Sequence, residues 1–175
     1  MKAPLTVRHA SIEDAPTLAA FAAKTFSDTY RGHGDPRGIA DYVVEHLSAS
    51  AVTALVLDTA STIIVGEVGS QLAGYGVLKA EEPPSCVTGP NPIELVRLYL
   101  GEKFLGQGFG EQLLLEVHAQ AERLGANTLW LWVYDRNVRA VRFYERLGFT
   151  RVGAREFLLG GSVYIDPIYS VPVRE

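Results

Sequence analysis

The first third of the chain has the hydrophobic pattern of one short strand followed by helices. Residues 5–9 alternate between apolar and polar side chains, as a strand does, and apolar side chains between residues 18 and 26 recur at helical spacing. Asp35 followed by Pro36 predicts the N-terminus of a second helix. The apolar run at residues 51–57 fits a third short helix or a strand equally well.

From residue 62 onward the pattern becomes that of strands separated by two further helices. Residues 62–68 and 72–80 predict a hairpin, because two strand-forming runs are joined by a short turn that contains glycine. A strand at residues 92–100 precedes an amphipathic helix, which Gly125 ends. The last predicted elements are a buried strand at residues 128–134, a helix at 137–147 and two strands at 150–159 and 162–171.

This order of elements predicts an α/β fold, of the α+β kind, in which one mixed sheet carries helices on both faces. The chain has 175 residues, a length that fits one domain better than two. The sequence contains no repeat, low-complexity tract or interdomain linker. We therefore predict a single domain that spans residues 1–175.

Composition and charge narrow the function classes. Hydrophobic residues make up 47% of the chain and charged residues 21%, the balance of a folded domain. A net charge of −4 argues against a nucleic-acid partner, which selects a basic surface. The one cysteine, Cys86, permits no internal disulfide, and no apolar run matches a signal peptide or a bilayer span. We expect a cytoplasmic protein without a membrane partner, and histidines without metal-ligand spacing predict no metal.

A glycine-spaced turn, Leu105-Gly106-Gln107-Gly108-Phe109-Gly110, lies between a predicted strand and a predicted helix. Glycine lets the backbone approach a ligand closely, and the first amides of the following helix have no partner within it. These amides and the helix dipole favour a bound phosphate. Two other interpretations stay open from the turn alone: a tight turn with glycines for geometry, or a dinucleotide site in which Glu111 replaces the third glycine.

Two motifs together resemble the GNAT family of N-acetyltransferases. The turn resembles that family's acetyl-CoA signature, Gln/Arg-x-x-Gly-x-Gly/Ala, with Leu105 in place of the usual Gln or Arg. Residues 137–149 match the more specific pattern Asn-x-x-Ala-x-x-Phe-Tyr-x-x-x-Gly-Phe at every fixed position. Helical spacing puts Asn137 and Tyr144 on nearly the same helix face, where both can contact a ligand. The same spacing suits a core tyrosine and a plain N-cap asparagine.

The resemblance implies a mostly antiparallel sheet whose central strand pair splays apart to admit acetyl-CoA as the cosubstrate. The pantetheine arm is then expected beside main-chain groups of the first strand of the pair, and the pyrophosphate at the glycine turn. Similar proteins are often dimers, so a homodimer is among the expected assemblies. The cofactor-binding residues that the resemblance implies are Leu98, Tyr99, Leu100, Leu105, Gly106, Gln107, Gly108, Phe109, Gly110, Glu111, Asn137 and Tyr144.

Two catalytic residues follow from the same resemblance, Glu94 and Tyr144. Glu94 matches in position the glutamate that serves as general base in several of these enzymes, where a carboxylate removes the amine proton directly or through water. A surface glutamate paired with Arg97 or with a neighbouring strand is the alternative. Tyr144 carries an O–H group that can protonate the leaving thiolate. Strict alternation places Glu94 on the same strand face as Val96, Leu98 and Leu100.

The expected reaction is direct transfer of an acetyl group, in a ternary complex, to a primary amine of a small molecule. Residues 25–30, followed later by Tyr42, resemble the bacterial polyamine (spermidine/spermine) acetyltransferase subgroup, and so does the pattern Glu94-Leu-x-Arg-x-Tyr at residues 94–99. This resemblance makes a polyamine a candidate acceptor. Phe26, Tyr30 and Trp132 are the candidate substrate contacts, although each also suits core packing. The alternatives are a non-catalytic acyl-CoA-binding or sensing module and acetylation of a protein N-terminus.

Overall fold

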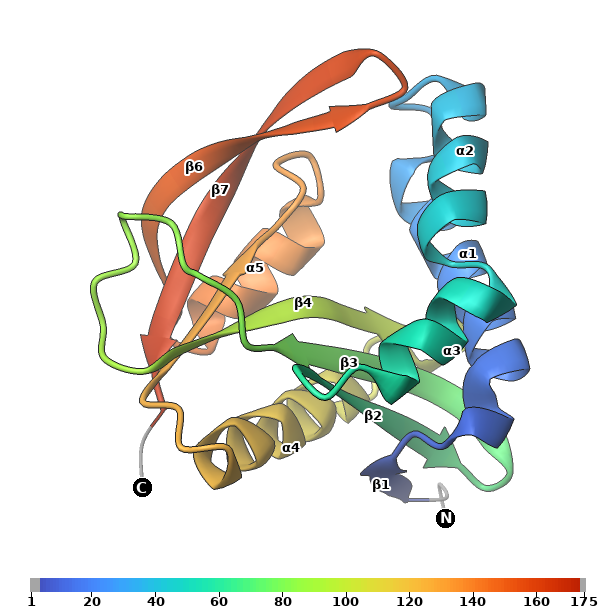
Figure 1. Ribbon diagram of the computed structural model, residues 1–175, viewed down its shortest axis with the longest axis horizontal. Helices are drawn as coiled ribbons and strands as arrows, with labels where there is room; N and C mark the ends of the chain where they lie inside the picture. The colour runs from blue at the N-terminus through green and yellow to red at the C-terminus, as the bar shows by residue number, and fades with distance from the viewer. Residues whose placement is uncertain (1–3, 174–175) are drawn as a thin grey trace.

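In residues 4–173, which this computed structural model describes, seven strands form one continuous sheet in the order β1-β2-β3-β4-β5-β7-β6 (Figure 1). Neighbouring strands are antiparallel except β4 and β5, which run parallel. The predicted mixed, mostly antiparallel sheet is thereby confirmed. The strands are β1 (Leu5–His9), β2 (Ser61–Val68), β3 (Gln71–Lys79), β4 (Pro92–Leu100), β5 (Thr128–Trp132), β6 (Thr150–Leu159) and β7 (Ser162–Pro172).

Helices cover both faces of the sheet, as the sequence predicts. The first three helices pack over one face and the last two over the other. Residues 51–57, for which the sequence fits a helix and a strand equally well, are helical. Ser48 Oγ caps this helix by accepting a hydrogen bond from Ala51 N at 3.3 Å. The helices are α1 (Ala15–Tyr30), α2 (Pro36–His46), α3 (Ala49–Leu57), α4 (Phe109–Arg123) and α5 (Val138–Arg146), with 3₁₀ turns η1 (Ile12–Asp14) and η2 (Glu102–Phe104).

Within residues 4–173, no single helix is long and apolar enough to cross a bilayer. Only α2 and α3 taken together reach that length and hydropathy, and this pair is bent by 45°.

Two apolar layers, one on each face of the sheet, hold the helices in place. Along β5, Leu129 and Leu131 are 0% and 1% exposed and pack into the layer under α4 and α5. Trp130 and Trp132 instead pack with Val87, in a separate cluster. The predicted alternation along this strand is confirmed, and β5 is buried on both faces.

The parallel pair β4–β5 is short and then opens. Its register joins Pro92 to Thr128 and ends where Glu94 pairs with Trp130. Strand β4 continues to Leu100, and Figure 1 shows it running away from β5 and β7 toward the α1 side of the molecule. The structure therefore has the splayed central pair that the resemblance implies, with the remaining β4 main chain unpaired on this side within the described residues.

A β-bulge in β4 changes which of its side chains share a face. The pairing of β4 with β3 skips Val96, which is the extra residue of the bulge. Leu98 and Leu100 pack into the apolar layer under α4 and α5, whereas Glu94 forms a hydrogen bond with Trp132 on the opposite side. The expectation that Glu94 shares a face with Leu98 and Leu100 is therefore wrong, because strict alternation does not continue through a bulge.

Candidate active site

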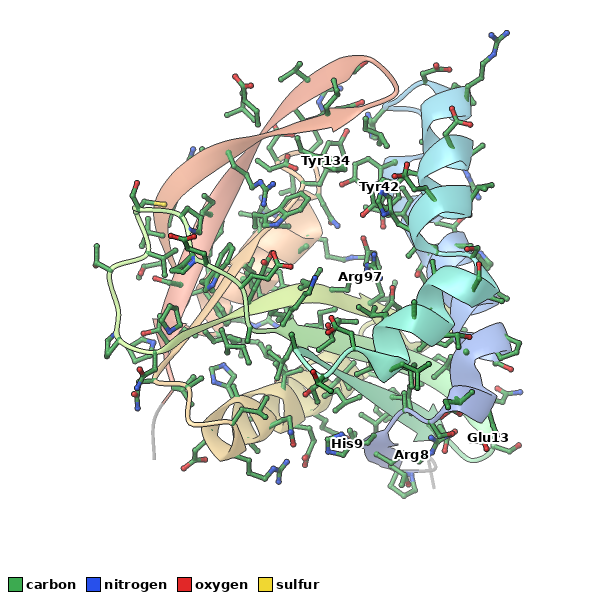
Figure 2. The ribbon with its side chains drawn as sticks, in the orientation of Figure 1. Arg8, His9, Glu13, Tyr42, Arg97 and Tyr134 are labelled. Carbon is green, nitrogen blue, oxygen red and sulfur yellow. The ribbon has the colours of Figure 1, made fainter. Side chains whose placement is uncertain are left out.

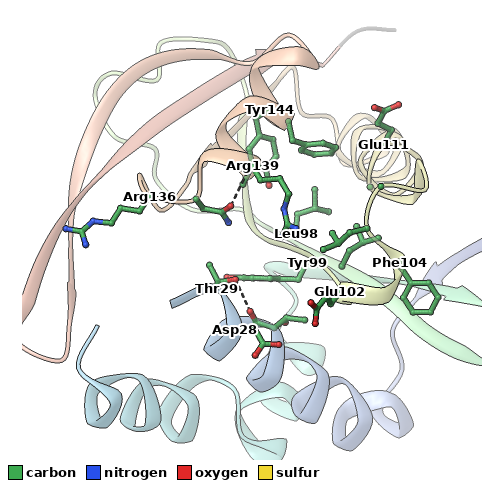
Figure 3. A pocket seen from close by; sticks show the side chains of 18 of the residues that line it. Asp28, Thr29, Leu98, Tyr99, Glu102, Phe104, Glu111, Arg136, Arg139 and Tyr144 are labelled. Atoms are coloured by element: carbon green, nitrogen blue, oxygen red, sulfur yellow. Dashed lines mark hydrogen bonds between the residues drawn. The ribbon is translucent and has the colours of Figure 1, made fainter. Parts of the chain in front are cut away.

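A cavity of about 620 Å³ lies where β4 and β5 have separated (Figure 3). Its walls come from the end of β4, the glycine turn before α4, the first turns of α5 and the last turn of α1. The structure thus brings together two motifs that are well separated in the sequence. The predicted cofactor-binding residues that line this cavity are Leu98, Tyr99, Leu100, Leu105, Gly106, Gly108, Gly110, Glu111, Asn137 and Tyr144.

The glycine turn leaves amide groups without helical partners beside this cavity. Gly106 and Gly108 have φ angles of +70° and +83°, a conformation that other residues rarely adopt. Gly108 is the N-cap of α4, and the first intrahelical bond runs from Gln112 N to Gly108 O at 3.2 Å. The amides of residues 109–111 therefore have no partner within the helix, and the helix dipole adds positive potential there. This arrangement suits a phosphate group.

The space next to the turn is open, as a ligand site requires. A Cβ atom added at Gly106 or Gly108 would meet no atom within 4 Å. Gly110 differs, because a Cβ atom there would approach the Phe143 ring to 3.3 Å. The first two glycines therefore serve the backbone conformation and ligand access, whereas the third allows α4 and α5 to pack closely.

Three other residues of the turn support it from within the protein. Leu105 N donates to Glu102 O at 3.2 Å, so its amide is already used in η2. The Gln107 side chain donates to Lys103 O at 2.6 Å, and Phe109 is buried in a small apolar cluster. Gln107 and Phe109 are not among the residues that line the cavity. Their predicted contribution to cofactor binding is thus limited to their main-chain amides.

Arginine side chains that the sequence interpretation missed bring positive charge to the cavity wall, which also carries acidic side chains. Arg136, Arg139 and Arg146 all line it. Arg146 forms an ion pair with Glu111 at 2.7 Å, but within residues 4–173 no carboxylate lies within 4.0 Å of the other two guanidinium groups. Figure 3 shows Arg139 reaching from α5 across the cavity toward Leu98. The sequence feature that could have identified Arg139 is its position two residues after Asn137, the first residue of the motif at residues 137–149.

Tyr144 is enclosed by aromatic rings yet reaches the cavity. It is 7% exposed, and its ring centroid lies 5.3 Å from those of Phe143 and Phe149. Burial raises the pKa of Tyr144 well above its ordinary value of about 10, so the hydroxyl stays protonated at neutral pH. Asn137 Oδ1 accepts a hydrogen bond from Ala140 N at 3.2 Å, which makes it the N-cap of α5. Tyr144 therefore packs in the core and Asn137 caps α5, and both residues also line the cavity.

Glu94 lies in a second cavity, of about 480 Å³, on the face of the sheet that carries α2 and α3. It is 5% exposed, and its Oε1 accepts a hydrogen bond from Trp132 Nε1 at 2.9 Å. Burial raises the pKa of Glu94, and the hydrogen bond from Trp132 opposes that shift. The alternative of a surface glutamate paired with Arg97 is wrong, because the side chain is buried, and its hydrogen-bond partner is instead Trp132 on the neighbouring strand β5, as the other form of that alternative had it.

The two predicted catalytic side chains do not share one cavity. Tyr144 lines the first cavity and Glu94 the second, and both cavities are bounded by β4. Glu94 is the last β4 residue with a β5 partner, so it stands where the strands part. The opening in the sheet is therefore approached by these side chains from opposite faces. Within residues 4–173, no group of three or more His, Cys, Asp or Glu side chains is placed to hold a metal ion.

The three predicted substrate contacts occupy different surroundings. Phe26 and Tyr30 are 5% and 4% exposed and line neither cavity. The Phe26 ring centroid lies 4.3 Å from that of Tyr42, and the Tyr30 ring centroid lies 4.6 Å from that of Tyr134. Figure 2 labels the two partners, Tyr42 and Tyr134. Trp132 lines the cavity that contains Glu94. Contact with substrate stays a prediction for all three, and the packing role is clear for the first two.

Known proteins share both the sequence pattern and the fold. Residues 22–149 match the sequence profile of the acetyltransferase (GNAT) family. An uncharacterized N-acetyltransferase of Mycobacterium tuberculosis is 34% identical over 148 residues, which cover 84% of this chain and 90% of the relative. A spermidine N(1)-acetyltransferase of Thermoplasma acidophilum is 28% identical over 149 residues, covering 83% and 88%. The structure of PaiA N-acetyltransferase from Thermoplasma acidophilum in complex with coenzyme A matches with a TM-score of 0.79 and 24% identity, covering 97% and 99%.

Proposed function

The chain belongs to the acetyltransferase (GNAT) family and is an acetyl-CoA-dependent N-acetyltransferase, and from this premise we propose that it acetylates a primary amine of a small molecule. The first cavity carries the proposal. There α4 begins without a side-chain cap next to an opening in the sheet. Arg136 and Arg139, which have no carboxylate partner within residues 4–173, line the same cavity. The second cavity gives an acceptor its own access to that opening, from the other face.

The groups along the first cavity fit the parts of acetyl-CoA in order. The amides at the start of α4 and the Arg139 guanidinium are suited to the pyrophosphate. The main chain of residues 98–100 has no strand partner toward β5 and is suited to pair with the amides of the pantetheine arm. Acetyl-CoA supplies an activated acyl group as a thioester. Such a pose brings that thioester to the opening beside Glu94 and Tyr144.

The reaction that follows is a direct acyl transfer. Glu94, directly or through water, takes a proton from the amine, and the amine nitrogen then attacks the thioester carbonyl carbon. A main-chain N–H of residues 98–100 polarises the carbonyl oxygen. The new C–N bond forms as the C–S bond breaks, and Tyr144 donates its phenolic proton to the departing sulfur. The nitrogen gives up its second proton as the intermediate collapses, and that proton, carried by water, restores the Tyr144 hydroxyl. The products are the N-acetyl amine and the free CoA thiol.

Glu94→Gln is expected to remove the acid limb of the pH–rate profile and to lower kcat/KM about tenfold near neutral pH. Only the ionised carboxylate accepts a proton, so wild-type activity should fall as the pH drops through the pKa of Glu94. That limb should lie above the ordinary glutamate pKa of about 4.3, since burial raises the pKa. The loss should shrink at higher pH, where the amine loses its proton to solvent. The measurement is kcat/KM against pH.

Trp132→Phe is the matched variant for this experiment. It keeps the carboxylate but removes the hydrogen bond that stabilises its charged form, so the acid limb should move to higher pH than in the wild type. An unchanged profile in Glu94→Gln would assign the proton transfer to another base.

The acceptor belongs to one of several amine classes. The name of the Thermoplasma acidophilum relative supports spermidine as a candidate. A protein N-terminus and a purely sensing role are the remaining alternatives. A panel of polyamines, amino acids, aminoglycosides and short peptides, with detection of the released CoA thiol, tests the proposal. We expect release of one CoA per N-acetylated small amine. Tight acetyl-CoA binding without CoA release from any amine would instead identify a sensor.

A further inference from the structure

Some charged side chains of the second cavity have ion-pair partners and others do not. Each of its acidic residues other than Glu94 has a polar partner. Glu81 pairs with Lys79 at 2.5 Å, and Asp58 accepts hydrogen bonds from Ser61 Oγ at 2.7 Å and Ala60 N at 3.0 Å. The remaining acid, at position 45, lies 3.7 Å from the neighbouring imidazole. Among the lysine and arginine side chains of this cavity, Lys79 is thus the one that pairs with one of its acids within residues 4–173.

The arginine side chains of the same cavity behave differently. Arg97 and Arg155 both line it, and within residues 4–173 neither has a carboxylate within 4.0 Å. Arg155 lies 4.5 Å above the Trp132 ring, although Asp166 is its cross-strand partner in the register. Asp166 is fully buried, its Oδ2 has no hydrogen-bond partner within residues 4–173, and it forms no ion pair with this guanidinium.

The β-bulge at Val96 explains how Arg97 comes to face this cavity. Strict alternation would place residues 94 and 97 on opposite faces of β4, but the extra residue returns Arg97 to the side of Glu94. Figure 2 shows Arg97 projecting from β4 into the space toward the first two helices, on the side where Tyr42 lies. One cavity is therefore bordered by the Glu94 carboxylate, which is the proposed proton acceptor, and by the guanidinium groups of Arg97 and Arg155, which have no carboxylate partner within residues 4–173.

We propose that Arg97 and Arg155 bind a carboxylate of the acceptor, so that the substrate is an amino acid or a similar small amine with a carboxylate close by. This inference rests on the proposed function, because it takes the second cavity as the acceptor site. The amine then lies toward Glu94 and the carboxylate toward the guanidinium groups, which bind carboxylates through paired N–H donors. A cavity of about 480 Å³ is of ample size for such a molecule. A polyamine would instead bring positive charge against two arginines.

Matched pairs of substrates test the inference: each L-amino acid against its own carboxamide, with spermidine as the polycation. The wild type should acetylate the acid at least about tenfold more efficiently, in kcat/KM, than the carboxamide. Arg97→Gln and Arg155→Gln should each reduce that preference by raising KM for the acid about tenfold, with little change in kcat or in KM for the carboxamide. Lys79→Gln is the matched control, because this cation of the same cavity is already paired.

Each outcome decides between distinct claims. Equal use of acid and carboxamide, preference for spermidine, or an unchanged acid preference in both arginine variants would overturn the carboxylate assignment while leaving N-acetyltransfer to small amines intact. A preference that falls equally in Lys79→Gln would also overturn it, because general cavity charge would then be the cause. Failure of every amine to release CoA would contradict the proposed function, and this inference with it.

Discussion

Gly108→Asp is expected to weaken acetyl-CoA binding by at least about 100-fold, or about 2.7 kcal/mol, while the protein stays folded. The φ angle of +83° at Gly108 is one that aspartate tolerates better than most residues. At the N-cap of α4, the new carboxylate would accept hydrogen bonds from the amides proposed to bind the pyrophosphate. It would also place negative charge against the phosphates. Isothermal titration calorimetry with acetyl-CoA measures the loss.

Gly108→Asn separates the charge from the shape of this substitution. Asparagine has nearly the same size, adopts positive φ and caps helices, but it is neutral. We expect a loss of about tenfold or less for Gly108→Asn, with thermal unfolding of both variants within a few degrees of the wild type. Full affinity in Gly108→Asp, with a folded protein, would place the pyrophosphate away from this turn.

The elements of the fold were largely predictable because local sequence and tertiary packing agree. Leu129 and Trp130 fall on opposite faces of β5, as alternation predicts, since the strand is straight and paired on both sides. Gly125 and Gly148 end their helices with φ angles of +79° and +88°, which favour glycine. At residues 51–57 hydrophobicity alone could not decide, because an apolar run of that length suits either structure.

The site was less predictable where a long-range pairing decides the geometry. The bulge at Val96 belongs to the pairing of β4 with β3, and β4 alone carries no pattern that reveals it. It moves Arg97 to the face of Glu94, so the second cavity contains a cation that strict alternation would place on the other face. Arg136 and Arg139 were missed for a different reason. A charged residue beside a motif is ordinarily a solvated side chain, and only the fold brings both residues to the cavity wall, where Arg139 reaches toward the turn before α4 (Figure 3).

The splay of β4 from β5 would allow the two groups proposed as catalytic, Glu94 and Tyr144, to serve one reaction from opposite faces of the sheet. Beyond Glu94 the β4 strand leaves β5, so the sheet no longer separates the two cavities by a continuous ladder. A thioester in the first cavity and an amine in the second can then meet through that opening. Closed pairing of β4 with β5 as far as Leu100 would leave Glu94 and Tyr144 on two sides of an intact sheet.

Tyr144→Phe is expected to lower kcat by about 100-fold or more, with the Kd for acetyl-CoA changed by less than about twofold. The ring stays in its aromatic surroundings, so the substitution removes the hydroxyl and little packing. Burial raises the pKa of Tyr144, which keeps the phenol protonated and able to donate as the thiolate leaves. Without that donor the sulfur departs as an anion into a buried site. Steady-state kinetics and calorimetry together measure the split between kcat and Kd.

Tyr169→Phe is the matched control for this variant. Tyr169 is also a buried tyrosine in the apolar layer under α4 and α5, but its hydroxyl donates to Glu145 at 3.0 Å and does not line the cavity. Loss of this hydroxyl should affect thermal stability more than kcat, because its partner is structural. If Tyr144→Phe turns over as fast as Tyr169→Phe, protonation of the leaving thiolate must come from solvent or from another donor. Tyr144 would then act in packing alone.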